Sequence, residues 1–120
     1  MGETVVIVDD NDGFRARARM LLDSEGYEVI GEAADGATGV EVVRRLRPDV
    51  ALLDVQLPDI DGFAVAERLR EQRAATSVVM VSTRDRSDYG RAVADCGALG
   101  FIAKSDICGA ALQSLLHTTR

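Results

Sequence analysis

The sequence predicts a doubly wound α/β fold, (βα)5, in which helices cover both faces of a parallel five-stranded sheet. Five short segments rich in valine, isoleucine and leucine alternate with segments whose apolar residues recur at helical spacing. The segments 4–8, 50–53, 78–81 and 101–103 carry almost no polar residues, so we expect each to be buried on both faces of a parallel sheet. Right-handed crossovers between such strands place helices on both sides of the sheet.

The first strand, residues 4–8, precedes a helix that is expected to end at Gly26, because glycine is common just after a helix C-terminus. Asn11 or Asp12 is the expected N-cap, because short polar side chains accept hydrogen bonds from the first backbone N–H groups of a helix. The apolar residues at helical spacing here are Phe14, Ala18, Leu21 and Leu22.

The second strand, residues 27–33, alternates only in part and suits the edge of the sheet. Asp35 and Gly36 then open a helix that runs to Leu46, and Pro48 stops it because proline cannot continue a helix. After the third strand, residues 50–53, we expect a loop over 55–62 and a helix to about Gln72. The apolar residues of that helix are Phe63, Ala66 and Leu69.

The last two strands, residues 78–81 and 101–103, each precede one predicted helix. Tyr89, Val93 and Cys96 lie at helical spacing on the fourth helix, which Gly97 ends. For the fifth helix we expect Ser105 or Asp106 as the N-cap. Its apolar residues are Cys108, Ala111, Leu112 and Leu115. The connections are short, so residues 1–120 form one predicted domain.

Composition excludes several classes of function. A formal net charge of −6 argues against nucleic-acid binding by this domain, because phosphate contacts need a basic face. No apolar run approaches the ~20 residues of a membrane helix, and the chain enters a strand at once. We therefore expect no membrane contact and a cytoplasmic location. Cys96 and Cys108 lack metal-ligand spacing, so we expect both as partly buried free thiols in a reducing compartment.

Polar residues stand where the apolar strands end. Because ligands bind outside the carboxyl ends of the strands in such a fold, these side chains predict one shared site. They are Asp9, Asp10, Asp54, Ser82 and Lys104. Three neighbouring carboxylates repel one another, and Lys104 offsets only one charge. A hard divalent cation such as Mg²⁺ fits the remainder, since it prefers one or two carboxylates together with water and phosphate.

Asp54, alone at the end of the central strand, is the best candidate to accept a phosphoryl group, because a carboxylate can attack phosphorus to form an aspartyl phosphate. Phosphoryl transfer needs mainly positioning and neutralisation of the phosphoryl oxygens, which Lys104, Ser82 and the cation can supply. No residue in the set resembles a hydrolytic base. The phosphoryl group is therefore expected to be kept, not passed quickly to water.

With these residues in place, the sequence resembles the receiver domain of two-component response regulators over essentially its whole length. The resemblance is closest to receivers of the NarL/FixJ type, which precede a helix-turn-helix DNA-binding domain. The matching motifs are VVIVDD at 5–10, PDVALLD at 48–54, Pro58, Gly62, VMVS at 79–82 and GALGFIAK at 97–104. The stretch GEAADG at 31–36 and Lys-Ser-Asp at 104–106 carry the likeness to the NarL/FixJ type.

The resemblance implies a flavodoxin-like fold with strand order 2-1-3-4-5. It implies that Asp54 accepts the phosphoryl group from a sensor histidine kinase or a histidine phosphotransfer protein, and that Lys104 contacts the phosphate. It also implies Mg²⁺ (or Mn²⁺) as the cofactor. Asp10 and Asp54 would bind the metal directly, Asp9 would bind through water, and Gln56 would offer its backbone carbonyl.

The family switch would involve two side chains. Ser82 would move toward the phosphoryl group and Phe101 would rotate inward behind it. This would reshape the face made by the fourth helix, fifth strand and fifth helix, through which the domain would bind an output domain, another partner or a second copy of itself. Many receivers have Lys-Pro where this chain has Lys104-Ser105, so we expect a trans bond there and a differently shaped loop.

Two positions are expected to tune the lifetime of the phosphorylated state, Gln56 by occlusion and Arg84 by its charge. Simpler interpretations stand beside these roles. The simpler role of Asp9 and Asp10 is that of an N-cap pair for the first helix. The simpler role of Ser82 is that of a turn residue whose side chain caps its own backbone. In the same way, the simpler interpretation of Phe101 is an ordinary core residue, and that of Lys104 is a solvated surface side chain. His117 and the arginines at 44, 45 and 47 are expected on the surface.

Two other functions compete with the signalling domain, which would have no dedicated substrate turnover. One is an aspartate-nucleophile phosphatase of the dehalogenase type. That enzyme needs a second aspartate two residues after the nucleophile, where this chain has Gln56. The other is a receiver-like interaction module that works without phosphorylation, for which the full set of polar residues would be needless.

Overall fold

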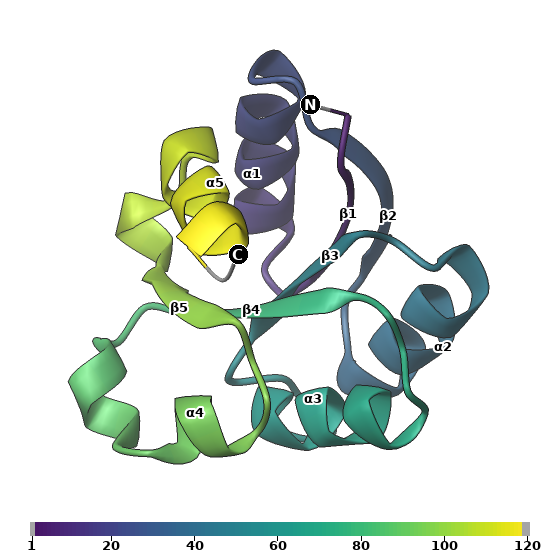
Figure 1. Ribbon diagram of the computed structural model, residues 1–120, viewed down its shortest axis with the longest axis vertical. Helices are drawn as coiled ribbons and strands as arrows, with labels where there is room; N and C mark the ends of the chain where they lie inside the picture. The colour runs from purple at the N-terminus through teal and green to yellow at the C-terminus, as the bar shows by residue number, and fades with distance from the viewer. Residues whose placement is uncertain (1, 119–120) are drawn as a thin grey trace.

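The structure, a computed structural model, describes residues 2–118, with the side chains of residues 117 and 118 left out. His117 therefore lies outside the described side chains. A parallel five-stranded sheet in the order β2-β1-β3-β4-β5 forms the centre, which confirms the predicted fold (Figure 1). Its strands are β1 (Thr4–Val8), β2 (Glu28–Ala33), β3 (Val50–Asp54), β4 (Ser77–Ser82) and β5 (Gly100–Ala103). The weakly alternating β2 lies at an edge, as expected.

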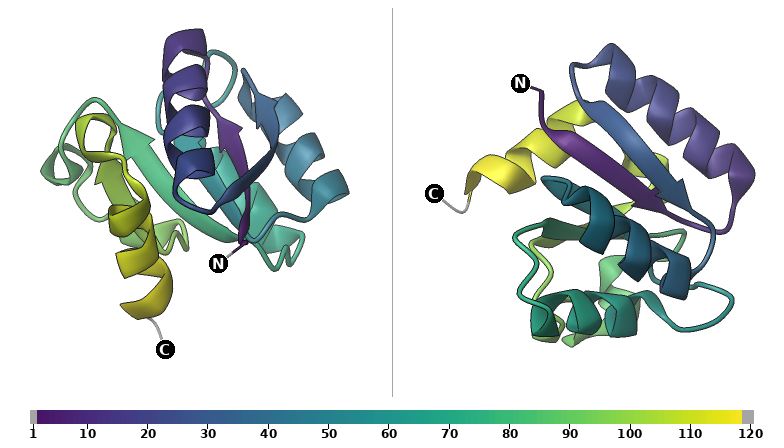
Figure 2. Two further views of the ribbon diagram at one scale, coloured as in Figure 1. Left: turned by 90° about the horizontal axis from the view of Figure 1, so that it is seen from above. Right: turned by 90° about the vertical axis from the view of Figure 1, so that its right-hand side faces the viewer.

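Helices cover both faces of the sheet (Figure 2). One face packs against α1 (Asp12–Ser24) and α5 (Gly109–Thr118). The other packs against α2 (Gly36–Leu46), α3 (Gly62–Glu71) and α4 (Ala92–Asp95). Within residues 2–118, no helix is both long enough and apolar enough to span a bilayer.

The central strands feed two hydrophobic layers, because successive side chains of a strand point to opposite faces. Val5 and Ile7 of β1 pack with Phe14 of α1, whereas Val6 and Val8 pack on the α2 and α3 side. All four valine and isoleucine side chains are fully buried. Full burial stabilises the fold by about 1.5–3 kcal/mol per side chain of this size, so the ends of β1, β3 and β4 are held rigidly.

The expectation of burial on both faces is wrong for the last strand. β5 lies at the sheet edge, and within it only Ile102 is fully buried. The helix before it, α4, has four residues and covers little of its outer side. Phe101 is half-buried in consequence.

A single fourth helix was also a wrong prediction. The chain forms a 3-10 turn, η1 (Arg86–Tyr89), and then the short α4. Gly90 separates them with φ 58° and ψ −126°, a conformation that no helix accommodates and that glycine alone adopts readily. Tyr89, Val93 and Cys96 still pack against the core, so their spacing identified the inward side but not the break.

Side chains cap the first three α-helices, in agreement with the predictions or extending them. Asn11, one of the two candidates, caps α1 by accepting a hydrogen bond from the Phe14 N–H at 2.9 Å. Asp35 caps α2 and Asp61 caps α3 in the same way. The third helix ends at Glu71 with Gln72 as its C-cap, as expected.

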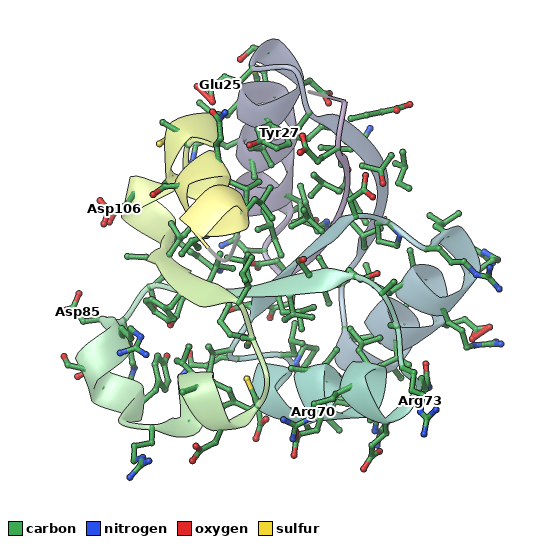
Figure 3. The ribbon with its side chains drawn as sticks, viewed as in Figure 1. Glu25, Tyr27, Arg70, Arg73, Asp85 and Asp106 are labelled. Atoms are coloured by element: carbon green, nitrogen blue, oxygen red, sulfur yellow. The ribbon has the colours of Figure 1, made fainter. Side chains whose placement is uncertain are left out.

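The N-cap predicted for α5 is wrong. Ser105 and Asp106 belong to a separate 3-10 turn, η2 (Lys104–Asp106). Instead, the sulfur of Cys108 accepts from the Ala111 N–H at 3.3 Å, and the Glu25 carboxylate accepts from the Gly109 N–H. Figure 3 labels Glu25 and Tyr27 where the end of α1 meets this helix. Cys108 is half-buried and Cys96 buried, and both are free thiols, as predicted. The Lys104–Ser105 bond is trans, also as predicted.

Asp59 ties the loop after β3 to the start of α2. Its two carboxylate oxygens accept from the N–H groups of Gly36 at 2.7 Å and Ala37 at 2.9 Å. These backbone hydrogen bonds at a helix N-terminus lower the Asp59 pKa to about 2. The loop that follows Asp54 is thereby fixed from outside the site.

We expect Asp59→Asn to lower the melting temperature by a few degrees at pH 7, because the charged acceptor at the helix start is lost. The carboxylate has a lower pKa in the folded state than in the unfolded state. Its stabilisation is therefore complete above about pH 4 and lost as the pH falls toward 2. The difference in melting temperature between the two proteins should shrink over that interval.

Thermal unfolding followed by circular dichroism between pH 2 and 7 measures this. Asp106→Asn is the matched control, since this carboxylate is exposed and, among residues 2–118, no backbone N–H donates to it. A difference between Asp59→Asn and the parent that stays constant with pH would contradict the assignment.

Candidate functional site

The sheet brings the predicted polar residues to its carboxyl edge. Asp9 and Asp10 follow β1, and Asp54 ends β3, where it pairs with Val81 of β4. One carboxylate oxygen from each of the three acids lies within 4.8 Å of the others. Lys104 follows β5 directly, and its ammonium reaches the same cluster.

Lys104 joins the two buried acids. Its Nζ lies 2.6 Å from Asp9 Oδ2 as an ion pair, and it donates a hydrogen bond to Asp54 Oδ2 at 3.3 Å. The ammonium also lies 4.7 Å from the centre of the Phe14 ring, close enough for a cation–π contact. With its side chain 11% exposed, Lys104 is not a solvated surface lysine.

Asp9 is held from several sides. Its Oδ1 accepts from the Asn11 N–H at 2.8 Å, and its backbone carbonyl accepts from Arg15 at 2.6 Å. Arg15 pairs in turn with Glu32 of β2. The Asp9 side chain is completely buried, and its Oδ2 faces the Lys104 ammonium. The N-cap of α1 is Asn11, so Asp9 does not serve that structural role.

Asp54 is 5% exposed, and this burial raises its pKa to about 6. Repulsion by the Asp9 carboxylate acts in the same direction. The Lys104 ammonium and the Gln56 N–H, which donates to Asp54 Oδ1 at 3.3 Å, lower the pKa and offset part of the rise. A further positive charge beside the acids would favour their ionised form.

The donor set fits a hard divalent cation. It consists of three carboxylates whose oxygens lie within 4.8 Å of one another, and the only ammonium that contacts them among residues 2–118 is that of Lys104. Asp10 is the exposed member and lies at the mouth, where an ion could enter with its water ligands. A single ammonium does not balance the three acids.

The site opens into a cleft of about 330 Å³. It is lined by Asp10, Asn11, Asp54, Gln56, Leu57, Pro58, Thr83 and Lys104. The sequence did not identify Asn11, Leu57 or Thr83 as residues of the cleft wall. Position could have identified Thr83, since it directly follows the strand-ending Ser82. Arg84 is exposed and lies outside this lining set.

Ser82 lies beneath the cleft and is 1% exposed. Its hydroxyl oxygen accepts from the Arg84 N–H at 3.1 Å, so the predicted turn that caps its own backbone is present. The same oxygen lies 2.6 Å from the Tyr89 hydroxyl. Tyr89 also contacts the Phe101 ring, with 5.9 Å between ring centres. The sequence marked Tyr89 only as a core residue.

Gly62 allows the loop after Asp54 to close on the site. Its N–H donates to the Val55 carbonyl at 2.7 Å, which begins α3 directly beside β3. A Cβ atom on Gly62 would lie 2.2 Å from the Asp54 carbonyl oxygen, so no side chain fits there. This close approach explains the glycine in the loop motif.

The fold and the carboxylate–lysine cluster together define a signalling domain that accepts a phosphoryl group at the carboxyl edge of a doubly wound sheet. Residues 5–113 match the model of the response regulator receiver domain. The chain belongs to this family and is a receiver domain of two-component response regulators.

The relatives and neighbours agree with that assignment. The chain is 34% identical over 101 residues to the DNA-binding transcriptional activator EvgA of Escherichia coli, covering 84% of this chain and 50% of EvgA. It spans about half the length of the curated relatives that it matches.

Two solved structures extend the comparison. The receiver domain of the NarL response regulator from Mycobacterium tuberculosis has a TM-score of 0.86 at 34% identity, with 97% of this chain and 98% of that chain covered. CheY in the CheX-CheY-BeF3-Mg complex of Borrelia burgdorferi has a TM-score of 0.85 at 25% identity, with 98% and 88% covered.

If the three acids form a metal site, Mg²⁺ should raise the melting temperature. At ten times its Kd, an ion that binds only the folded state adds about 1.4 kcal/mol to the free energy of unfolding, or several degrees. Asp10→Asn should abolish the shift, because it removes the exposed ligand without disturbing the buried pair with Lys104. Asp106→Asn should retain it.

The measurement is a thermal melt with MgCl₂ against NaCl of equal ionic strength, since a general salt effect would act in both. An equal shift in the two salts, or a full Mg²⁺ shift in Asp10→Asn, would count against the site.

Proposed function

We propose that Asp54 is the phosphoacceptor of this domain and that a sensor histidine kinase or a histidine phosphotransfer protein supplies the phosphoryl group. The observation that carries the proposal is the placement of Asp54. Its carboxylate lines the cleft at the end of the central strand, beside the Asp9–Asp10 pair and in contact with the Lys104 ammonium. A reacting phosphorus in the cleft can approach it from the open side.

In the transfer, an Asp54 carboxylate oxygen forms a bond to phosphorus and the phosphorus–nitrogen bond of the donor histidine breaks. The imidazole nitrogen leaves with the bonding electrons. Lys104, which bonds Asp54 before the reaction, then neutralises a phosphoryl oxygen. Asp10 and Asp54 would hold Mg²⁺ (or Mn²⁺) directly, Asp9 through water and Gln56 by its carbonyl. When bound, the ion would supply positive charge to the phosphoryl oxygens.

The domain would store the phosphoryl group and not turn over a substrate. Besides the metal-binding acids and Lys104, the cleft is lined by amide, hydroxyl and apolar side chains, so it offers no further carboxylate as a hydrolytic base. Gln56 occupies the position where a dehalogenase-type phosphatase needs its second acid. The phosphatase alternative therefore ranks below a signalling role, and its sign would be steady turnover of a phosphomonoester.

The output surface would be the face of α4, β5 and α5. Next to it, a groove of about 380 Å³ lies between the start of η1, β5 and α5, with Phe101 and Leu115 among its lining residues and the charged Asp85, Arg86 and Asp106 at its edges. Figure 3 labels both acids on this side of the molecule. We propose that Ser82 and Phe101 change position on phosphorylation and alter binding here, to an output domain or to a second copy of the domain.

The similarity to EvgA, a DNA-binding transcriptional activator, supports transcription regulation as the output. An output domain outside these residues would contact DNA, since this domain carries a net charge of −6. We further propose that the domain, residues 1–120, acts in the cytoplasm, without membrane contact. Its two free thiols suit that reducing compartment.

Incubation with acetyl phosphate and Mg²⁺, followed by intact-mass spectrometry, tests the proposal. We expect one added phosphoryl group that is absent in Asp54→Asn and in samples treated with a chelator. Asp106→Asn, with an exposed carboxylate away from the acid cluster, should be labelled like the parent. Absence of label with every small-molecule and histidine-kinase donor would favour the phosphorylation-independent module.

The lifetime of the phosphorylated state should depend on Gln56 and Arg84. Gln56 lines the cleft beside Asp54, so Gln56→Ala should admit water and speed dephosphorylation several-fold. Arg84→Ala should change the rate less, because this side chain lies outside the lining set and would act only through its charge. The decay of the phosphorylated mass with time measures both rates. Unchanged decay in the double variant would show that neither residue tunes it.

A further inference from the structure

A second hydroxyl group controls the position of the Ser82 hydroxyl. The oxygens of Ser82 and Tyr89 are 2.6 Å apart, a short hydrogen bond in which either group can donate. Ser82 also accepts from the Arg84 N–H at 3.1 Å. Both contacts lie on the side of η1. The hydroxyl proposed to read the phosphoryl group is thus already engaged elsewhere in the unphosphorylated domain.

The Tyr89 ring links this hydrogen bond to the output face. Its centre is 5.6 Å from that of Phe63 in α3, in an edge-to-face arrangement at 69°. The Phe101 ring of β5 lies at 5.9 Å and is tilted by 50°. Tyr89 therefore contacts two rings of neighbouring elements while its hydroxyl binds the end of β4. Such contacts favour a small set of ring positions.

The backbone turn that ends at Tyr89 holds this residue in place. Tyr89 ends η1, which is held by a capping box in which the Asp85 N–H donates to Asp88 Oδ2 at 3.1 Å. Gly90 then takes a positive φ of 58°, and no atom lies within 4 Å of where its Cβ would be. The turn is thus locally closed, followed by a residue with room to change conformation.

We propose that Tyr89 is a positioning residue that holds the Ser82 hydroxyl on the η1 side of β4 until Asp54 is phosphorylated. This inference rests on the proposed function of Asp54 and Ser82. When Ser82 turns to the phosphoryl group, its bond to Tyr89 must break. The released tyrosine hydroxyl then needs a new partner, so the ring in contact with Phe63 and Phe101 shifts with it.

The Ser82–Tyr89 hydrogen bond therefore adds a free-energy cost to activation. The hydrogen bond stabilises only the unphosphorylated arrangement, and it therefore biases the domain against the switched one. Removing the tyrosine hydroxyl should release this bias while the ring and its aromatic contacts stay in place. It should make a phosphoryl group at Asp54 easier to accommodate, not harder.

The test is a titration of the whole chain with beryllium fluoride, a stable phosphoryl analogue, in saturating Mg²⁺, with binding followed by calorimetry. Tyr89→Phe should lower the half-saturating concentration about three- to tenfold, as expected for the loss of one neutral hydrogen bond from the free state. In a Ser82→Ala background the same change should have no effect, because there is no hydroxyl to hold. This coupling separates positioning from a general packing role.

Tyr27→Phe is the matched control. It removes the hydroxyl of the other tyrosine, which donates to the Gly109 carbonyl at 3.3 Å near the start of α5. Its beryllium fluoride titration should match the parent. Urea unfolding of each variant shows whether it is folded. If Tyr89→Phe is less stable than the parent, the comparison in the Ser82→Ala background still shows whether its effect on binding needs the Ser82 hydroxyl.

The outcomes are distinct. If acetyl phosphate labels Asp54 but Tyr89→Phe titrates like the parent, the role of Tyr89 is wrong and the proposed function stands. An effect of Tyr89→Phe that persists without the Ser82 hydroxyl also overturns it. If the parent neither takes up the phosphoryl group nor binds the analogue, the proposed function fails and this inference fails with it.

Discussion

The contact on which the site depends is the Lys104 ammonium between the buried carboxylates of Asp9 and Asp54. Two acids this close and this buried repel each other, and the raised pKa of Asp54 reflects its desolvation first and this repulsion second. One ammonium offsets only part of it. The acids are held together by β1, β3 and the core beneath them, so the fold maintains an arrangement that the charges alone would not choose. A site of this kind gains most from an added cation and a bound phosphoryl group.

Rigidity of the central strands makes this possible. β1 and β3 are fully buried along nearly all their lengths, and their side chains lock into two separate hydrophobic layers. Their ends therefore cannot drift apart to relieve repulsion. The opposite holds at β5, an edge strand with a half-buried Phe101 and a four-residue helix before it. Fewer buried contacts there mean that rearrangement costs less. The domain thus combines a fixed site with a sheet edge that can rearrange at lower cost.

Sequence reasoning succeeded where short-range patterns decide the structure. The strand-ending positions of Asp54 and Ser82 follow from apolar runs, and the Asn11 and Asp35 caps follow from local spacing. It failed where distant residues decide. The α5 cap comes partly from Glu25, 84 positions before Gly109, and no local motif announces it. The break at Gly90 was hidden because Tyr89 and Val93 keep helical spacing on either side of it. The Ser82–Tyr89 bond was missed for a similar reason, since an aromatic residue at core spacing gives no sign that its hydroxyl has a partner.

The bond between Ser82 and Tyr89 bears on how large the switch can be. Full conversion between two packings, from 1:99 to 99:1, needs about 5.5 kcal/mol of differential stabilisation. Part of the free energy that the phosphoryl group supplies is needed to break contacts that exist only in the resting state. A single neutral hydrogen bond accounts for about 1 kcal/mol of that, so it adjusts the resting population without blocking the switch. Because the Tyr89 ring contacts the rings of both Phe63 and Phe101, the proposed movement of Ser82 would also disturb the packing of α3 and β5. The proposed output face would then respond through contacts that are already in place.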